Sequence, residues 1–232
     1  MEWTLVLGRF YGIDTFIEFL TILVSLSVSF YSFRVYKLIK DKHYKWFSLA
    51  FLLLGIIFIF KILSNITFLH KFEVQEANFV FTFMSHLKSM EIVNFFSFVF
   101  YKTFHLIGFL LLFLILSKNE ERNKNILFFY LSLIVVLFSI YFNFVFHITL
   151  VFILIYLTLY FYENYKKVEN INAFLVFMSF LIILTSHLFF IFSDVNTLFY
   201  LFGEVLLLIG FMCLLTNQIR LKIKSKKVLK SK

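Results

Sequence analysis

The chain has 232 residues, of which 62% are hydrophobic and 15% are charged. Soluble globular domains average about half apolar and about a quarter charged residues, so this composition excludes an ordinary soluble domain and predicts an integral membrane protein. The formal net charge of +9 could suggest nucleic acid, but the basic residues fall between apolar runs, and we expect no nucleic-acid partner. The single cysteine, Cys213, excludes an internal disulfide.

Apolar runs long enough to cross a hydrocarbon layer of about 30 Å predict the membrane helices. In chain order, we expect them at residues 14–36, 46–67, 95–117, 126–142, 144–162, 173–192 and 198–219. The fourth and fifth form one apolar run that would be about 55 Å long as a single helix, which is too long to cross the membrane once. Its only polar break is Asn143, so we expect a turn there. The sequence therefore predicts an all-α bundle of seven transmembrane helices.

Lysine and arginine crowd into every second connection, and this asymmetry predicts the orientation in the membrane. The first, third and fifth connections and the C-terminal tail carry Arg34, Lys37, Lys40, Lys42, Lys45, Lys118, Arg122, Lys124, Lys166, Lys167, Arg220, Lys222, Lys224, Lys226, Lys227, Lys230 and Lys232. The opposite side has only Arg9, Lys71 and Lys88. We therefore expect a multi-pass protein of the cell membrane with its N-terminus outside and its C-terminus in the cytoplasm.

The sequence also predicts two segments outside the membrane, a C-terminal tail and a helix in the outer connection. Residues 1–219 are expected to form the transmembrane domain, and residues 220–232 a basic cytoplasmic tail that contacts anionic lipid. In the outer connection, residues 68–94, apolar side chains recur at helical spacing from Phe79 to Met90. This pattern is typical of a short helix that lies in the membrane interface.

The first predicted helix has a narrow polar stripe. At 100° per residue its polar side chains fall within about 80° of one another, which indicates a face turned toward protein rather than lipid. The stripe consists of Asp14, Glu18, Thr21, Ser25, Ser29 and Ser32. In the last predicted helix, Gly203 and Gly210 are expected to form a separate packing face.

The ionisable side chains within the membrane runs are expected to face the bundle interior, because a bare charge in hydrocarbon is costly. Counted from the outer ends of the helices at 1.5 Å per residue, they lie about 16 Å deep or less, all in the outer half of the bilayer. The inner half is nearly free of charge. These residues are Asp14, Glu18, Lys61, Lys102, His105, His147, His187 and Glu204.

This layering predicts a hydrated pocket that opens to the exterior and binds a small anionic or amphipathic ligand, as in a sensor or receptor. Lysine and histidine can hold an anionic group while neighbouring Phe and Tyr side chains cover an apolar body. We expect Lys102 and His105 on the floor of the pocket and His187 and Glu204 on its wall. The predicted ligand-binding residues are Glu18, Lys61, Asn65, Lys102, His105, His187 and Glu204.

Two alternatives involve no such ligand site. The two glutamates, Glu18 and Glu204, could neutralise the buried lysines Lys61 and Lys102 in a purely structural network. A transporter is a further alternative, but it should also carry polar groups through the inner half, or helices broken by Gly or Pro. We find neither feature in the sequence.

A metal site is the remaining alternative. His105, His147 and His187 could ligate Zn or Fe, or a haem, in an intramembrane enzyme. Each histidine stands alone on its helix, however, and no pair has the H-E-x-x-H spacing. We assign no catalytic residue and no cofactor from the sequence, and we do not expect an enzyme.

The segment YSFRVYKLIKDKHYKWFSLAFLLLGIIFIF resembles the first helix–loop–helix of small multi-span archaeal membrane proteins, and GEVLLLIGFMCLL is similar to a later segment of such proteins. The overall plan resembles the seven-helix sensor regions attached to some histidine kinases. Only a short basic tail follows Gln218 in this sequence. The resemblance implies a sensor role that works through a separate cytoplasmic protein, and it assigns no catalytic residue.

Overall fold

The computed structural model describes residues 13–73, 80–117, 122–193 and 195–230. Within these ranges, side chains are described except at 13–14, 64–73, 80–91, 122–125, 197 and 222–230. The described chain consists of helices and short connections, with no strand. The helices are α2 (Ile13–Ile39), α3 (Lys42–Glu73), α4 (Val80–Ser117), α5 (Arg122–Ser139), α6 (Asn143–Val168), α7 (Ile171–Ile191) and α8 (Thr197–Lys230).

Six of these seven helices are long and apolar enough to cross a membrane, and the all-α membrane bundle predicted from the sequence is confirmed. The exception in length is α5, whose apolar part, Ile126–Ser139, extends over about 21 Å. The turn predicted near Asn143 is also confirmed, because α5 ends at Ser139 and α6 begins at Asn143. The protein is therefore a multi-pass membrane protein.

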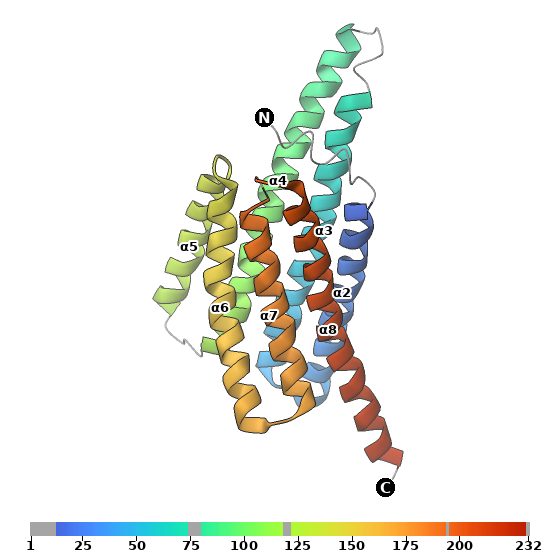
Figure 1. Cartoon of the computed structure of the whole chain (residues 1–232), viewed down its shortest axis with the longest axis vertical. Coiled ribbons are helices and arrows are strands. Elements are labelled where there is room, and N and C mark those ends of the chain that lie inside the picture. Colours follow the sequence, from blue (N-terminus) through green and yellow to red (C-terminus); the bar gives the residue numbers. More distant parts are fainter. Residues whose placement is uncertain (1–12, 74–79, 118–121, 194, 231–232) are drawn as a thin grey trace.

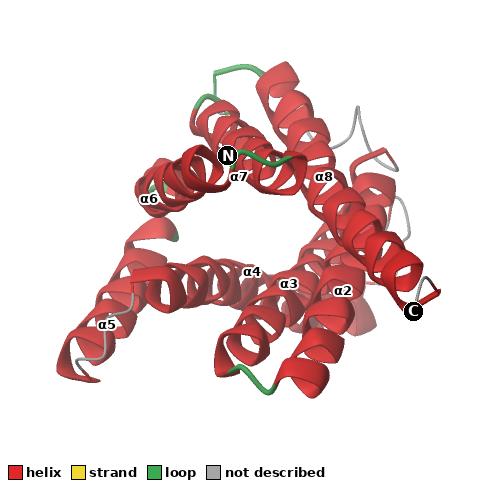
Figure 2. Cartoon of the chain, turned by 90° about the horizontal axis from the view of Figure 1, so that it is seen from below, coloured by secondary structure: helices red, strands yellow, loops and turns green. Residues whose placement is uncertain are grey.

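The six long helices form a closed ring. Neighbours pack in the order α2, α3, α4, α6, α7 and α8, and α8 returns to α2. The short helix α5 lies outside this ring against α4 and α6, and it forms the edge of the bundle in Figure 2. Every long helix thus has one side toward the centre of the ring, where buried polar groups from several helices can meet.

The connections alternate between the two ends of the bundle (Figure 1). Those between α2 and α3 and between α6 and α7 lie at one end, and those between α5 and α6 and between α7 and α8 lie at the other. Two helices at the first end stop at non-glycine residues with a left-handed backbone, Lys40 (φ 61°) and Glu169 (φ 46°). The N–H of Glu169 bonds to the Tyr165 carbonyl at 2.8 Å, and the Asn170 side chain caps α7 by accepting from the N–H of Ala173 at 2.8 Å.

Two boundaries differ from the prediction. From Val80 on, the stretch expected to form a separate interfacial helix belongs to the continuous helix α4. Likewise α8 continues to Lys230, so most of the predicted basic tail extends the last membrane helix. In both places charged residues interrupt the apolar pattern, but a helix can leave the membrane without ending, and hydropathy alone does not mark where the helix ends.

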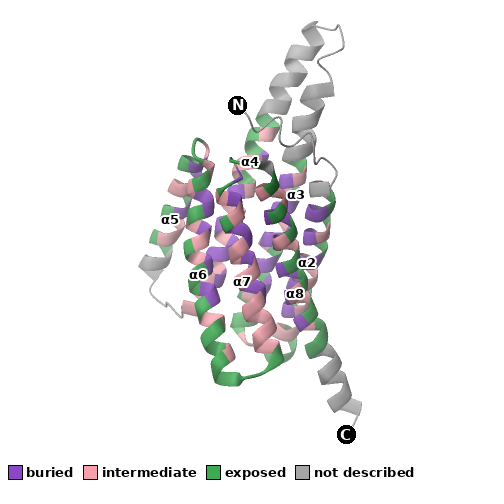
Figure 3. Ribbon diagram, viewed as in Figure 1, coloured by how far each residue is buried: buried purple, intermediate pink, exposed green. Residues whose placement is uncertain are grey.

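Burial follows the ring. Buried residues line the inner sides of the helices, and exposed ones lie around the outside (Figure 3). Large apolar side chains are exposed on most helices, including Phe30 at 64% and Phe152 at 69%, as expected of a surface that faces lipid. The predicted glycine face is a close contact with α7, because a Cβ at Gly210 would come within 2.5 Å of Ile183 and one at Gly203 within 2.6 Å of Phe190.

Candidate functional site

The ammonium group of Lys61 lies between two carboxylates inside the ring. It is 3.0 Å from Glu18 Oε1 and donates a short hydrogen bond to Glu204 Oε1. The lysine comes from α3, and the glutamates come from α2, which packs against α3, and from α8, the next helix around the ring; all three side chains are buried. The expected pairing of Lys61 with carboxylates is confirmed, and one amine holds both glutamates.

The second buried lysine has different partners. Lys102 donates to the main-chain carbonyl of Ser139 at 2.7 Å, and its nitrogen lies 4.0 Å from the centre of the Phe98 ring. The structure therefore differs from the alternative in which the two glutamates are shared between Lys61 and Lys102, because both glutamates contact Lys61. The reason is the helix order: α4 carries Lys102 on the side next to α5 and α6, whereas Glu18 and Glu204 lie on α2 and α8, which pack against each other.

Three histidines from three helices form a second group. The Nδ1 atoms of His147 and His187 are 3.3 Å apart, and the ring centres of His105 and His187 are 5.3 Å apart. Aromatic rings enclose them, since Phe146 packs edge-on to both His105 and His147. Each histidine stands alone on its helix in the sequence, but the structure brings the His187 ring next to the rings of both His105 and His147.

The lysine group and the histidines belong to one cluster. Tyr101 connects them, because its ring centre is 5.9 Å from Lys61 Nζ and 5.5 Å from the His105 ring. Phe190 connects them on the α7 side, 5.9 Å from Lys61 Nζ and 5.6 Å from the His187 ring. The polar cluster is hereafter the set Glu18, Lys61, His105, His147, His187 and Glu204.

Three polar atoms of this cluster find no hydrogen-bond partner among the described residues. They are Glu204 Oε2, His105 Nδ1 and His187 Nε2, and each belongs to a side chain that is at most 1% exposed. A buried polar atom without a partner costs about 1–3 kcal/mol. These atoms come from three helices, α8, α4 and α7.

For two further predicted residues the structure describes the main chain but not the side chain. Asn65 lies in α3, but its side chain is outside the described part of the chain, as is that of Asp14. Among the described residues, no three His, Cys, Asp or Glu side chains converge as metal ligands. The pair His147 and His187 alone does not make a protein metal site of the usual kind, which needs at least three ligands.

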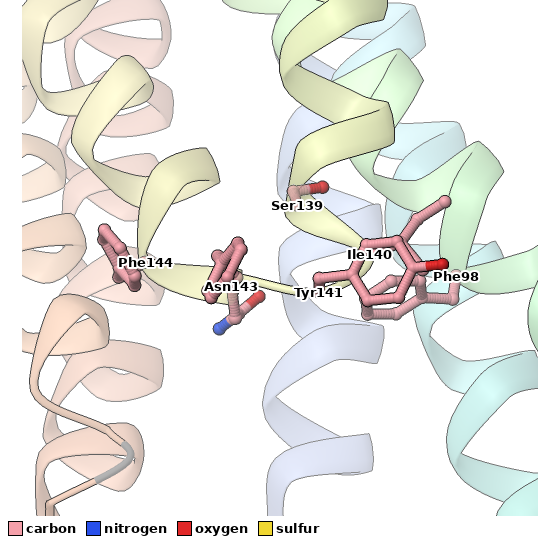
Figure 4. A pocket seen from close by; sticks show the side chains of 7 residues that line it. Phe98, Ser139, Ile140, Tyr141, Asn143 and Phe144 are labelled. Atoms are coloured by element: carbon pink, nitrogen blue, oxygen red, sulfur yellow. The ribbon is translucent and has the colours of Figure 1, made fainter.

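A cavity of about 300 Å³ lies beside the cluster, at the turn between α5 and α6. Its lining is mainly aromatic, with polar groups from Ser139, Tyr141 and Asn143 (Figure 4). Lys102 borders it, since the lysine contacts two lining residues, Ser139 and Phe98. One turn further along α6, His147 belongs to the polar cluster. None of the predicted ligand-binding residues with a described side chain lines this cavity.

Two contributors could not be found from charge patterns. Tyr101 joins the two halves of the cluster, but a tyrosine in a Phe-rich run has no distinguishing signal in the sequence. The Ser139 carbonyl belongs to the main chain at a helix end. No family model matches the chain, and comparison with curated proteins and with solved structures finds no similar protein. The candidate site therefore rests on the geometry of this chain alone.

Proposed function

We propose that this protein is a receptor or sensor of the cell membrane that binds a small amphipathic amine in the polar cluster, with the ligand entering from outside. The observation that carries the proposal is the group of three buried polar atoms without partners, Glu204 Oε2, His105 Nδ1 and His187 Nε2. A ligand that donates to the carboxylate and exchanges hydrogen bonds with the imidazoles would remove their desolvation cost.

The charge around Lys61 favours an amine over the anionic ligand expected from the sequence. That expectation treated Lys61 as available, but its ammonium already holds Glu18 and Glu204. This lysine and two carboxylates carry one excess negative charge. A cationic amine would balance it, whereas an anion would add to it.

The surroundings favour a ligand with an apolar, preferably aromatic, body. Phe109 stacks on His105 at 5.4 Å between ring centres, and Phe190 packs on both His147 and His187. Such rings attract a cationic headgroup as well as an apolar skeleton. The cavity beside Lys102 supports entry at this end of the bundle, which the basic connections at the other end predict to be extracellular.

The test compares two probes of similar size and opposite charge, phenethylamine and phenylacetate. Each is added to the purified protein in nanodiscs while thermal unfolding is recorded. Phenethylamine should raise the unfolding midpoint, by an amount equivalent to about 2.7 kcal/mol at one hundred times its Kd. Phenylacetate should leave the midpoint unchanged. If phenylacetate stabilises the protein more, or if neither probe shifts the midpoint, the proposal is wrong.

Matched variants locate the binding. His187→Phe keeps an aromatic ring at the centre of the cluster but removes Nε2, and it should abolish the shift with phenethylamine. The control is His43→Phe at the exposed start of α3, which should retain the shift. An equal response of the two variants would place binding elsewhere on the protein. A sensor role also needs a separate cytoplasmic partner, and we propose the basic end of α8 as its contact.

A further inference from the structure

Polar groups continue from the cluster toward the other end of the bundle along the seam where α2 meets α3 and α8. Below Glu18, α2 presents a row of buried hydroxyl groups: Thr21, Ser25, Ser29 and Ser32. At the far end Gln218 of α8 contacts this row, because its Nε2 is 3.3 Å from Ser32 Oγ and 3.3 Å from the Val28 carbonyl. The predicted polar stripe therefore faces protein, as expected.

The two ends of the seam are in register. Glu18 and Glu204 meet at Lys61, and Ser32 and Gln218 meet at the far end. Ser32 follows Glu18, and Gln218 follows Glu204, by the same number of residues, which corresponds to about 21 Å of helix. Helices α2 and α8 thus run side by side in the same direction between two polar contacts. The seam covers most of a hydrocarbon layer of about 30 Å.

Between these ends the third helix also supplies polar groups. The hydroxyl of Ser29 donates to the Ser48 carbonyl, and that of Ser48 donates to the Ser29 carbonyl, each at 2.8 Å. The two hydroxyl oxygens are 3.1 Å apart. One turn higher, the Ser25 hydroxyl has no partner among the described residues and is fully buried. Here α3 places Gly55 against α2, so that the helices approach closely.

Partnerless buried oxygens occur at each level of the seam. Glu204 Oε2 is at the cluster end, Ser25 Oγ is in the middle, and Gln218 Oε1 is at the far end with Asn217 Oδ1 beside it. Packing alone needs small residues here, but it does not need polar atoms whose hydrogen bonds are unmade. These levels are too far apart to bond directly, so a hydrogen-bonded chain along the seam needs the intervening hydroxyl groups and water.

We propose that this seam, from Glu204 and Glu18 past Ser25 and Ser29 to Ser32 and Gln218, is a path for protons across the membrane. A proton adds to the Glu204 carboxylate at the outer end, passes between hydroxyl groups and intervening water, and leaves to water beside Gln218. One positive charge moves inward and nothing is oxidised or reduced. The path uses different groups from the proposed ligand site, except for the two glutamates.

The side chains that line the seam favour a proton over a hydrated metal ion. Leu207, Phe211 and Leu214 of α8 are buried and lie on the same face of α8 as Glu204 and Gln218. Because these side chains are apolar, this face of α8 offers no ligand between Glu204 and Gln218 that could replace the hydration shell of an ion. A hydroxyl both donates and accepts, so that a proton can hop along the file without a wide channel. The titratable groups around the entrance are Glu18, Lys61, Tyr101, His105, His187, Tyr200 and Glu204.

The test is proton flux into liposomes of phosphatidylcholine and phosphatidylglycerol that contain the full chain and the trapped pH indicator pyranine. Valinomycin and potassium clamp the membrane potential, and a pH step starts the flux. Wild-type liposomes should acidify at least tenfold faster than protein-free liposomes. A wild-type rate equal to that of protein-free liposomes would overturn the proposal.

Three variants distinguish proton transfer along the seam from leakage through a less tightly packed bundle. Ser25→Ala removes the central hydroxyl with little change in volume and should slow the flux at least tenfold. Gln218→Leu should slow it similarly at the far end. The control is Ser27→Ala, because the Ser27 hydroxyl lies outside the stripe and bonds to the Leu23 carbonyl of its own helix. If Ser25→Ala conducts like wild type, or if Ser27→Ala slows the flux as much, the seam is not the path.

Unfolding midpoints of all variants show that each is folded. Failure of ligand binding in the His187→Phe protein leaves the flux result unaffected.

Discussion

Lys61 is the counter-ion of both buried glutamates. Its single positive charge is shared by Glu18 and Glu204, so that removing the lysine and removing one glutamate have different consequences. Without the lysine, two carboxylates face each other in a low-dielectric interior. Without Glu204, the pair of Lys61 and Glu18 remains balanced. The three charges therefore contribute unequally to the free energy of unfolding, and this could not be predicted from the sequence.

Lys61→Met should destabilise the protein by about 3–5 kcal/mol, because it leaves buried carboxylates without a counter-ion. Glu204→Gln should cost clearly less, since Glu18 still neutralises the lysine. The free energy of unfolding in mixed micelles, titrated with a denaturing detergent, measures both. The control is the triple variant Lys61→Met, Glu18→Gln, Glu204→Gln, which should recover most of the loss. Equal losses for Lys61→Met and Glu204→Gln would contradict the shared arrangement.

The site could be predicted in part from single residues. The common depth of Glu18, Lys61 and Glu204 predicted that they would meet, and they do. Which lysine takes the glutamates could not be predicted, because it depends on the order of helices around the ring. The inner half was expected to lack polar groups because only charges were counted there. The hydroxyl of Ser29 and the amide of Gln218 are neutral, yet both form buried contacts between helices.

At the scale of the elements, the helix positions follow from the sequence and the helix ends do not. Apolar runs of about 20 residues mark the parts of the chain that lie in lipid. Ends depend on backbone geometry that hydropathy does not report, as at Glu169, where α6 stops in a left-handed conformation without a glycine. Such a conformation costs a residue with a Cβ about 1–2 kcal/mol.

Glu169→Gly should therefore stabilise the protein, by about 1 kcal/mol, because glycine adopts φ near 46° without steric cost. The unfolding midpoint in detergent should rise. The neighbouring Val168→Gly provides the matched control, since Val168 is the last residue of α6 and a glycine within a helix is unfavourable. A lower midpoint for Glu169→Gly would show that its side chain makes a contact worth more than the relieved strain.

The contact between α7 and α8 gives a second prediction at this scale. Gly210→Ala places a Cβ 2.5 Å from Ile183 Cγ1 and 3.1 Å from the Ser179 carbonyl oxygen, and the main chain of α7 cannot yield as a side chain can. The overpacked pair of helices should lose about 1–3 kcal/mol of stability. Ile209→Ala, on the exposed side of the same turn of α8, serves as the control and should change stability less. A neutral Gly210→Ala would mean that α7 and α8 can separate without loss.

At the scale of the whole molecule, α5 decides the topology. Six helices are long enough to cross the membrane, and α5, with about 21 Å of apolar helix, is shorter than a typical hydrocarbon layer. A short helix can still cross where the bilayer thins or flanking residues reach the interface. The basic connections predict that it crosses. The connections after α2 and after α6 lie on the same side of the membrane only if an even number of helices crosses between them, and this requires α5 to cross in addition to α3, α4 and α6.

Cysteine labelling in sealed vesicles tests this topology. In a Cys213→Ala background, His43→Cys lies at the start of α3, next to the connection after α2, and Val195→Cys lies in the connection after α7; both positions are exposed. Five helices, α3 to α7, separate them. If α5 crosses, a membrane-impermeant thiol reagent added outside should label Val195→Cys at once and His43→Cys only after the membrane is opened. If α5 does not cross, only four crossings separate the two positions, and the reagent should reach both or neither. The positive charge that crowds the connection after α2 favours its placement in the cytoplasm, so we expect the first result.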